Sequence, residues 1–535
     1  MGDAVIGMVE QRRLVSARSG TAALIDSAVP REKASVVAAA ASEQSSARFT
    51  ALFFLFSIEL IALMIARLPE TMNFEAFAFG DRGANLTLQY LVANGYRPAI
   101  DFGYHYGLLP ILVARGWFAI FGASPFAYQL AMLACNLLLA WALAKILTHL
   151  PVAGIGLALT IVALGFAFQS SYPNLAQALE ATLLCHAIAE QARGSRINAL
   201  AIATAAIFAK PSMGYIYGLL LIILIVRDLA RTGVTPRRLI DTFAPAAIVF
   251  LTLATTLCLV YGGQAFIRTA LPVEGATAYH TLNFGLMGSG RALWDPKGVP
   301  WTYYLVDAVG FWIASGAVLF AAALLQLRAR YAEKLPARRG EIIVTCAILH
   351  LAFLILFFGN QWSWIYYSYL PVIGCAIVVS LGPVQRRIGV ALCMVALLSW
   401  IGPVYWSQKR WRTTSTDAVT ARLWTTTDER SEWSKVLAMT HGKKTVMMNS
   451  MGAVELLFPG FESPVSLFLK PGLMTSSDVE RKLSQLGTAQ MVVAPILPGP
   501  CDGVANTPEF STAIKTFEPL WTGQHFEVFA RSGIR

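Results

Sequence analysis

A few charged side chains stand in apolar surroundings in this sequence, and they are the first candidates for chemistry. Asp81 lies in "AFAFGDRGANLTLQYL", where a glycine stands on either side of an Asp-Arg pair and a helical pattern follows. A carboxylate held in this way suits a general base that accepts a proton from a hydroxyl group. The alternative is that Asp81 pairs with Arg82 or Arg97, or that it only begins the helix.

A second carboxylate, Asp101, lies in "GYRPAIDFGYHYGLLP" and is followed closely by Tyr104, His105 and Tyr106. Aromatic side chains offer flat faces that suit sugar rings, although tyrosine is also an ordinary anchor at a membrane interface. The segment therefore combines a carboxylate with binding surfaces, and Tyr104 and His105 are candidate substrate contacts.

Lys210 is the strongest cationic candidate, because it precedes a proline in "FAKPSMGYIYGLLL" between two short apolar runs. A fixed cation there can stabilise the charge that grows on a departing phosphate. The alternative is a lysine that only reaches toward the membrane surface. Arg268, His280 and Arg291 in the loop 263–302 are further candidates, with plain solvated loop charges as the alternative.

Glu180 lies inside the apolar run "NLAQALEATLLCHAIAE", where burying a charge costs on the order of 3 kcal/mol. We expect it to bond a neighbouring helix, with contact to a substrate as the alternative. Asp307 and the aromatic segment 360–371 are further candidates for lining the same cavity, and a belt of interfacial aromatics explains the segment equally well.

The sequence does not contain the motifs of several common classes of enzyme and transporter. The sequence has no Walker loop, no HExxH, and no GxSxG between a strand and a helix. Its seven cysteines show no CxxC metal spacing, and six of them lie in apolar stretches. An ATP-driven pump and a disulfide framework are therefore disfavoured. No cofactor is assigned, and a divalent metal stays an open alternative.

The composition is that of a membrane protein. Hydrophobic residues make up 56% of the 535 residues and charged residues only 14%, and the mean hydropathy is +0.57. The net charge of +11 comes from short Lys and Arg clusters between apolar runs, which favours a membrane rather than a nucleic acid. With about 20 apolar residues needed per crossing, we predict about eleven transmembrane helices, near 49–67, 125–147, 149–168, 174–191, 195–209, 211–227, 240–262, 303–327, 341–359, 366–382 and 387–406.

The basic clusters predict the orientation. They recur before the first span and after every second one, so they all fall on one side, which the positive-inside rule makes cytoplasmic. We expect a flexible cytoplasmic tail over 1–48 and a transmembrane domain over 49–406. The outer segments are then 68–124, 263–302 and 407–535. We expect 108–122 to form an amphipathic helix on the outer surface.

The last part of the chain is more polar and predicts a small outward α/β domain over 407–535. Short apolar strands at 445–449 and 491–495 flank a helix with a capping-box start from Ser477 to Glu480. The final stretch "PLWTGQHFEVFARS" predicts two strands around a Thr-Gly-Gln turn. The predicted fold is thus an α-helical polytopic membrane protein with a small α/β domain at its C-terminal end.

The order of these features carries a resemblance. A first span, an acidic residue, a helix ending in "NGYRP", then "IDFGYHYGLLP" and a surface helix ending in "FGAS" resemble the first outer loop of the C superfamily of glycosyltransferases. That superfamily includes the lipid A aminoarabinose transferases and the protein O-mannosyltransferases. "LAKIL", "FAKPSMGYIYGLLL" and the outward C-terminal domain add to the similarity, which covers most of the chain after residue 49.

The resemblance implies an inner-membrane enzyme that transfers a sugar, with inversion, from a polyprenyl-phosphate donor to a glycolipid, polysaccharide or protein at the outer face. The acid of the first loop matches Asp81, as the general base or its orienter. Many relatives carry a second acid where this sequence has Arg82, which leaves the use of a metal open. We expect Asp101 and its aromatics beside Asp81, facing Lys210 across a cavity. The predicted catalytic residues are Asp81 and Asp101, and the predicted substrate contacts are Lys210, Arg82, Tyr104, His105, Arg268, His280 and Glu180.

Two other functions fit the same composition. A transporter or flippase of a lipid-linked glycan is the main alternative, although such proteins commonly show inverted repeats and none is evident in the sequence. A scaffold whose C-terminal domain binds cell-envelope partners is the third.

Overall fold

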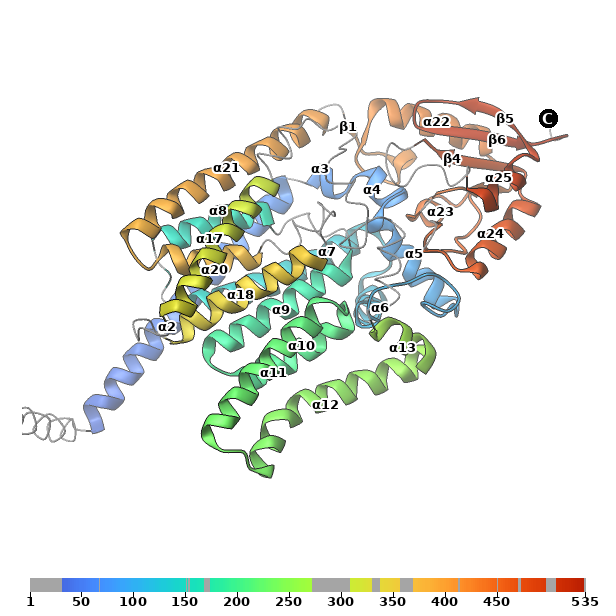
Figure 1. Ribbon diagram of the computed structural model, residues 1–535. Coiled ribbons are helices and arrows are strands. Elements are labelled where there is room, and N and C mark those ends of the chain that lie inside the picture. Colours follow the sequence, from blue (N-terminus) through green and yellow to red (C-terminus); the bar gives the residue numbers. More distant parts are fainter. Residues whose placement is uncertain are drawn as a thin grey trace, which may run out of the picture. The chain divides into compact units, whose positions relative to one another are not determined.

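The computed structural model describes residues 31–66, 68–150, 152, 154–167, 174–271, 308–329, 337–356, 369–411, 414–449, 451–469, 473–496 and 507–533. The described chain is mostly helical, with a small sheet close to the C-terminus (Figure 1). It divides into two units, Met1–Phe54 and Leu55–Arg535, and all contacts described below lie within the second.

As far as the structure describes residues 1–411, their regular elements are all helices. They are α2 (Arg31–Ala66), α3 (Leu68–Thr71), α4 (Phe74–Ala78), α5 (Asp81–Ala93), α6 (Leu109–Phe121), α7 (Pro125–His149), α8 (Ile155–Ala167), α9 (Leu175–Arg193), α10 (Arg196–Ala209), α11 (Met213–Thr232), α12 (Pro236–Tyr261), α13 (Gly263–Ala270), α17 (Ala308–Ala329), α18 (Ala337–Leu356), α20 (Tyr369–Val379) and α21 (Pro383–Trp411) within the described residues.

Each of the eleven predicted spans overlaps one of these helices. Within the described residues, four helices are both long and apolar enough to cross a membrane: Gln44–Ala66 within α2, Pro125–His149, Met213–Thr232 and Pro236–Tyr261. The total of about eleven crossings stays a prediction. The two short predicted spans 195–209 and 211–227 fall in the 14-residue α10 and the 20-residue α11.

Helix α2 begins at Arg31 and so includes residues 31–48 of the predicted tail, whose boundary and cytoplasmic location stay predictions. The segment 31–48, "REKASVVAAAASEQSSAR", is rich in alanine, which has the highest helix propensity of all residues. A polar composition therefore does not prevent it from continuing the apolar helix toward the N-terminus. Residues 1–30 lie outside the described residues.

Helix α9 lies at the centre of one group of helices. It packs against α7 on one side and α10 on the other, and α10 in turn carries both α11 and α12. Its start is fixed by Asn174, whose side-chain oxygen accepts a hydrogen bond from the Gln177 amide (3.0 Å). A second group is formed by α8, α17, α18, α20 and α21.

Helix α6 confirms the helix predicted for 108–122. It buries Ile111, Ala114 and Phe118, which are spaced three and four residues apart, while Ile120 on another face is exposed. The exposed face carries Ile120 and Phe121 as well as Arg115, so the amphipathic location on the outer surface stays a prediction.

The C-terminal part forms the predicted sheet domain. Its elements are β1 (Thr414–Ser415), the 3₁₀-helix η3 (Ala418–Thr420), β2 (Thr425–Thr426), α22 (Thr427–Thr440), β3 (Thr445–Met447), α23 (Val454–Leu457), α24 (Ser476–Thr488), β4 (Met491–Pro495), α25 (Pro508–Ile514), β5 (Phe517–Thr522) and β6 (Phe526–Arg531). The larger sheet has the order β3-β4-β6-β5. Strand β3 runs parallel to β4, with Val446 opposite Val492, and the other pairs are antiparallel. The four predicted strands are therefore confirmed, although α21 extends five residues beyond the expected boundary at 406.

Helix α24 begins two residues earlier than predicted. The capping box is formed by Thr475 and Asp478 rather than by Ser477 and Glu480. Both pairs have the same spacing, so the sequence pattern fits either. The capping box forms with Asp478 because its carboxylate accepts hydrogen bonds from the Thr475 amide (2.8 Å) and from the amide of Gly103 in the first outer segment (3.0 Å).

The first outer segment and the C-terminal domain share a core. The rings of Phe74 and Phe79 lie 5.3 and 6.1 Å from the ring of the fully buried Trp433, and Phe79 also contacts Phe526. The Thr87 hydroxyl donates to the Gly452 carbonyl (2.6 Å). These contacts fix the start of α5 against the C-terminal domain.

Candidate active site

A small cavity opens where α5, α6 and α9 meet the C-terminal domain. Its volume is about 30 Å³, and its lining residues are Asp81, Ala84, Asn85, Leu88, Gln89, Tyr104, Tyr106, Pro110, Ala114, Asn174, Ala176, Leu467 and Phe468. A space of this size holds one or two water molecules. A sugar ring therefore requires the walls to move apart, and Leu467 and Phe468 form the wall that comes from the C-terminal domain.

Asp81 is the only acidic side chain among these lining residues, and it is the first residue of α5. The amides at a helix N-terminus favour a negative charge there. Its position is fixed locally: the Asn85 side chain donates to the Asp81 carbonyl (2.6 Å), and a Cβ on Gly83 would come within 1.7 Å of the Phe77 carbonyl oxygen. The second glycine of "GDRG" is thus required for the close approach of α5 to α4.

Asparagine and tyrosine side chains connect Asp81 to the rest of the cavity. Asn85 accepts a long hydrogen bond from the Leu175 amide (3.4 Å), and the Asn174 amide group donates to the Tyr106 hydroxyl (3.2 Å). Tyr106 lies against the ring of His105, with centroids 4.3 Å apart. A set of neighbouring residues therefore runs from the Asp81 backbone along the start of α9 to Tyr106 and His105.

Lys210 lies at the far end of this set. It follows α10 as its C-cap residue and is buried, with 4% of its surface exposed. The nearby carboxylate of Glu180, which is fully buried, is its electrostatic partner. Glu180 also accepts hydrogen bonds from the Ser212 hydroxyl (3.2 Å) and the Met213 amide (3.3 Å), so it fixes the turn after Lys210. Glu180 bonds a neighbouring helix, as the sequence predicts.

His105 stands close enough to Lys210 for their charges to interact. Burial, and then the Lys210 charge, lower the pKa of His105 to about 4. The imidazole is therefore neutral at physiological pH, and it can donate or accept a hydrogen bond but adds no positive charge. Burial also raises the pKa of Tyr104, whose hydroxyl donates to the Gly107 carbonyl (3.1 Å) and stays protonated.

Two glycines hold the segment Gly103–Gly107 in place. A Cβ on Gly103 would lie 1.5 Å from the Leu473 carbonyl oxygen, and one on Gly107 would lie 2.0 Å from the Phe208 carbonyl oxygen. The Gly107 amide also donates to the Ala209 carbonyl (3.1 Å). We call residues 103–107 the GYHYG clamp, because one end is bound to the C-terminal domain and the other to the turn that carries Lys210.

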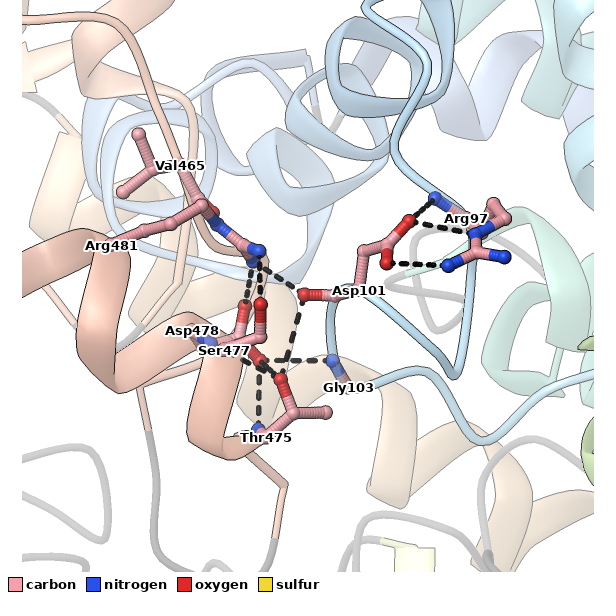
Figure 2. A network of polar contacts seen from close by, with 8 residues as sticks. All are labelled: Arg97, Asp101, Gly103, Val465, Thr475, Ser477, Asp478 and Arg481. Atoms are coloured by element: carbon pink, nitrogen blue, oxygen red, sulfur yellow. Dashed lines mark hydrogen bonds and ion pairs between the residues drawn. The ribbon is translucent and has the colours of Figure 1, made fainter.

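Asp101 is placed differently from the expectation. Figure 2 shows its carboxylate turned to Arg97, whose backbone amide (2.7 Å) and guanidinium (3.1 and 3.2 Å) both donate to it. These hydrogen bonds lower the pKa of Asp101. It does not line the cavity with Asp81. Its carbonyl points the other way and accepts from Arg481, so the residue connects two elements rather than facing a substrate.

Asp478 and Arg481 of α24 form the other half of this network (Figure 2). Arg481 donates to Asp478 (3.0 Å), to the Val465 carbonyl (2.9 Å) and to the Asp101 carbonyl, and its guanidinium lies over the Tyr96 ring. Burial raises the pKa of Asp478, while its hydrogen bonds and the Arg481 charge oppose that rise. The first turn of α24 thus holds the backbone at 101–103, immediately before the aromatic residues of the clamp.

The remaining predicted residues are distributed as follows. Arg82 is buried and donates to the Thr71 carbonyl, and it is absent from the lining of the cavity. Arg268 donates to the Ala99 carbonyl (2.9 Å), so it supports the first outer segment from α13. His280, Arg291 and Asp307 lie outside the described residues, as do residues 360–368 of the aromatic segment.

Asn85, Asn174 and Gln89, which have side-chain amides, line the cavity, although the sequence did not assign these residues to the site. The sequence pattern could have identified Asn174, because an asparagine just before an apolar helix predicts the N-cap of that helix. Asn85 belongs to an Asn-Leu-Thr triplet, which a sequence scan reads as a glycosylation acceptor. In the described parts of the chain no group of three His, Cys, Asp or Glu residues is placed to hold a metal ion.

The apolar helices and this cluster define a polytopic membrane protein with a polar site near the ends of α9 and α10. Comparisons with known protein families and with curated proteins find no match. Two solved structures are similar to the chain: ArnT from Cupriavidus metallidurans bound to undecaprenyl phosphate (12% identity, 89% of this chain and 98% of that chain covered, TM-score 0.49) and the same protein in the apo state (13%, 88% and 97%, TM-score 0.39). At these TM-scores and identities, neither structure assigns a role to a residue of this chain.

Proposed function

We propose that this protein is a membrane glycosyltransferase. It transfers a sugar from a polyprenyl-phosphate donor to the hydroxyl group of a glycolipid, polysaccharide or protein at the outer face of the inner membrane. The observation that supports this most directly is the placement of a carboxylate, Asp81, and a buried lysine, Lys210, at opposite ends of one polar cluster. The two groups meet the two electrostatic needs of glycosyl transfer.

In the proposed reaction the acceptor hydroxyl oxygen attacks the anomeric carbon from the face opposite the phosphate, which inverts the configuration. Asp81 takes the proton of that hydroxyl, which is typically worth about 10² to 10⁴ in rate. The bond between the anomeric carbon and the phosphate oxygen breaks, and the polyprenyl phosphate leaves with the electron pair. Lys210 stabilises the charge that develops on the leaving phosphate.

The other groups of the cluster have supporting parts in this proposal. Neutral His105 and the Tyr106 hydroxyl offer hydrogen bonds to the phosphate or the sugar, and the rings of the clamp offer faces for stacking. Glu180 holds Lys210 in position. Asp101, Arg82 and Arg268 then act as positioning residues, because each one bonds backbone or a neighbouring side chain.

The proposed setting follows the predicted orientation, with the N-terminus in the cytoplasm and the domain 407–535 outside. The cluster lies between α9, α10 and the C-terminal domain. A site there meets both the outer aqueous phase and the lipid layer that holds a polyprenyl chain. The apolar faces of α11 and α12, with Ile223, Ile248 and Leu251 well exposed, are suited to contact with lipid.

The test is the substitution Asp81→Asn in membranes from cells that express the protein at equal level. We expect transfer from a polyprenyl-phosphate sugar to fall by at least 100-fold, because the amide cannot accept the proton. Glu75→Gln is the matched control, since Glu75 lies six residues earlier and is absent from the cavity lining, and it should keep full activity. Full activity of Asp81→Asn would refute the base assignment. Movement of a labelled lipid-linked glycan across vesicles without any change in its sugar content would instead establish the transporter.

A further inference from the structure

A second cavity lies at the other end of α9 and α10. Its volume is about 500 Å³, within the range of small-molecule sites, and its lining residues are Arg193, Gly194, Ser195, Arg196, Ile197, Asn198, Ile225, Asp228, Leu229, Thr232 and Thr242. They come from the α9–α10 turn, the end of α11 and the start of α12. The cavity forms because α11 and α12 both pack on α10.

The two cavities are separated by the length of a membrane-crossing helix. Asn174, immediately before α9, lines the proposed active site, and Arg193, the last residue of α9, lines the second cavity. The 19 residues of α9 span about 28 Å at about 1.5 Å per residue. The hydrocarbon core of a bilayer is about 30 Å thick. The second cavity therefore lies at the depth of the opposite headgroup layer.

The charges around this cavity have a positive excess. Arg193 is 63% exposed and has a long contact to Glu190 (3.7 Å), while Arg196 is held between Glu341 and Asp228. Arg227 also contacts Asp228 (3.5 Å).

Further cations lie near the α9–α10 turn. The guanidinium of Arg338 lies beside Gly194, where a Cβ would approach it to 2.8 Å. Lys145 lies near Glu190 (3.9 Å), and the charges of Arg193, Lys145 and Arg338 all reach His149. Together, these residues comprise five cations and three carboxylates, of which Arg193, Arg196 and Asp228 line the cavity itself.

The other side of the cavity is apolar and continues into the exposed faces of two helices. Ile197, Ile225 and Leu229 line the cavity itself. Beside it, Val226 of α11 and Ile240 of α12 are 51% and 65% exposed. Both helices are long and apolar enough to cross a membrane. A ligand that combines an anionic group with apolar chains fits this arrangement better than a free anion does.

We infer that this cavity binds the headgroup of an anionic phospholipid. The phosphate lies against Arg193 and Arg338, hydroxyl groups of the headgroup meet Asn198 and Thr232, and the acyl chains follow the outer faces of α11 and α12. Basic pockets between transmembrane helices are a recognised kind of lipid site. The inference is independent of the proposed function, because no residue of the proposed active site takes part.

The test uses the purified full-length protein in detergent, with phosphatidylglycerol, phosphatidylcholine and inorganic phosphate as probes and native mass spectrometry as the readout. We expect phosphatidylglycerol to remain bound in preference to phosphatidylcholine. The double variant Arg193→Gln/Arg338→Gln should bind it roughly tenfold to thirtyfold more weakly, from the loss of two cations at the headgroup. Arg193 lines the cavity, and Arg338 lies beside its lining residue Gly194. The control Arg237→Gln/Arg387→Gln makes the same change of charge at exposed positions that neither line the cavity nor contact Gly194, and it should bind as the unmodified protein does.

A second variant keeps the inference testable if the double variant does not fold. Asn198→Asp places a negative charge near the start of α10, where helices tolerate acids well, and it should also weaken phosphatidylglycerol binding about tenfold. Equal binding by the double variant and its control, or equal binding of phosphatidylcholine, would overturn the inference. Displacement of the lipid by millimolar inorganic phosphate would show a free-anion site and would overturn it as well.

Discussion

Lys210 and Glu180 illustrate at the scale of single residues why an ionisable group persists in an apolar chain. Removing one partner of a buried ion pair leaves the other uncompensated, which costs about 3 to 5 kcal/mol. Glu180 is completely buried and bonds the turn at Ser212 and Met213, so its carboxyl group is fixed in place. The interaction between Lys210 and Glu180 therefore contributes to folding, in addition to any role of Lys210 toward a phosphate. An experiment must separate these two contributions.

Lys210→Met is predicted to lower both stability and transfer, whereas Lys210→Met/Glu180→Gln should restore folding without restoring transfer. The double variant removes both charges, so no uncompensated carboxylate remains, yet the cation for the leaving phosphate is still missing. Melting temperature and initial rates at varied donor concentration measure the two effects. A double variant that folds and transfers normally would leave Lys210 with a structural role only.

At the scale of elements, the GYHYG clamp joins a turn of the helix bundle to the C-terminal domain. Its first glycine is held by Asp478 and its last by Ala209. The positions of the three aromatic residues between these glycines therefore depend on both the helix bundle and the C-terminal domain. A displacement of about 1 Å in a catalytic group can cost about 100-fold in rate, so the clamp is expected to be sensitive to small changes of the backbone.

Gly107→Ala is predicted to reduce transfer by roughly 10- to 100-fold. The new methyl group would meet the Phe208 carbonyl at 2.0 Å, and the segment must move away from Lys210 to relieve the clash. Gly116→Ala is the matched control, because no atom lies within 4 Å of its Cβ position in α6. That control should be neutral or more stable by about 0.5 to 1 kcal/mol. Equal rates for the two alanine variants would show that the clamp does not set the geometry of the site.

Sequence patterns identify elements well where the signal is local. Eleven apolar segments and four strands each coincide with an element, because hydropathy and alternation depend on neighbouring residues only. The start of α24 shows where this fails. Thr475 with Asp478 and Ser477 with Glu480 have the same spacing, and the choice is made by Gly103, which is 375 residues away from Asp478.

At the scale of the whole molecule, the C-terminal domain and the first outer segment are one packing unit. Leu88, Phe102, Phe208 and Leu467 belong to one buried cluster that joins α5, the clamp region, α10 and the C-terminal domain. Trp433 packs against both Phe74 and Phe79. The predicted boundary at 407 is therefore a boundary in the chain rather than a border between independent bodies.

Trp433→Ala is predicted to destabilise the outer part by about 3 to 5 kcal/mol, since it removes a fully buried large side chain. The loss should affect the first outer segment and the C-terminal domain together. Hydrogen exchange of both regions, followed in parallel, measures this. Leu520→Ala, at a position 53% exposed in β5, is the control and should change stability by less than about 0.5 kcal/mol. Loss of protection in the C-terminal domain alone would show two separate units.

The roles of the predicted site residues stay predictions, and the structure brings only some of these residues together. Asp81, Tyr104 and Lys210 lie in or beside one cluster, as their neighbours in the sequence suggested. Asp101 does not face the cavity, because Arg97, four residues earlier, captures its carboxylate. Asn174 joins the cluster from α9, and no local pattern relates it to Tyr106, since the contact depends on how α9 packs.

The contact between Thr87 and Gly452 also sets an order of events during synthesis. The hydroxyl emerges 365 residues before the carbonyl that it binds. At about 5 to 20 residues per second, the ribosome needs roughly 20 to 70 s to make the residues between them. In the proposed orientation, the first outer segment is outside the membrane for that interval without its partner, while most of the helices are still being inserted. Its apolar side chains, Phe74 and Phe79 above all, are then exposed to proteases and chaperones, and completion of the outer site waits for the last fifth of the chain.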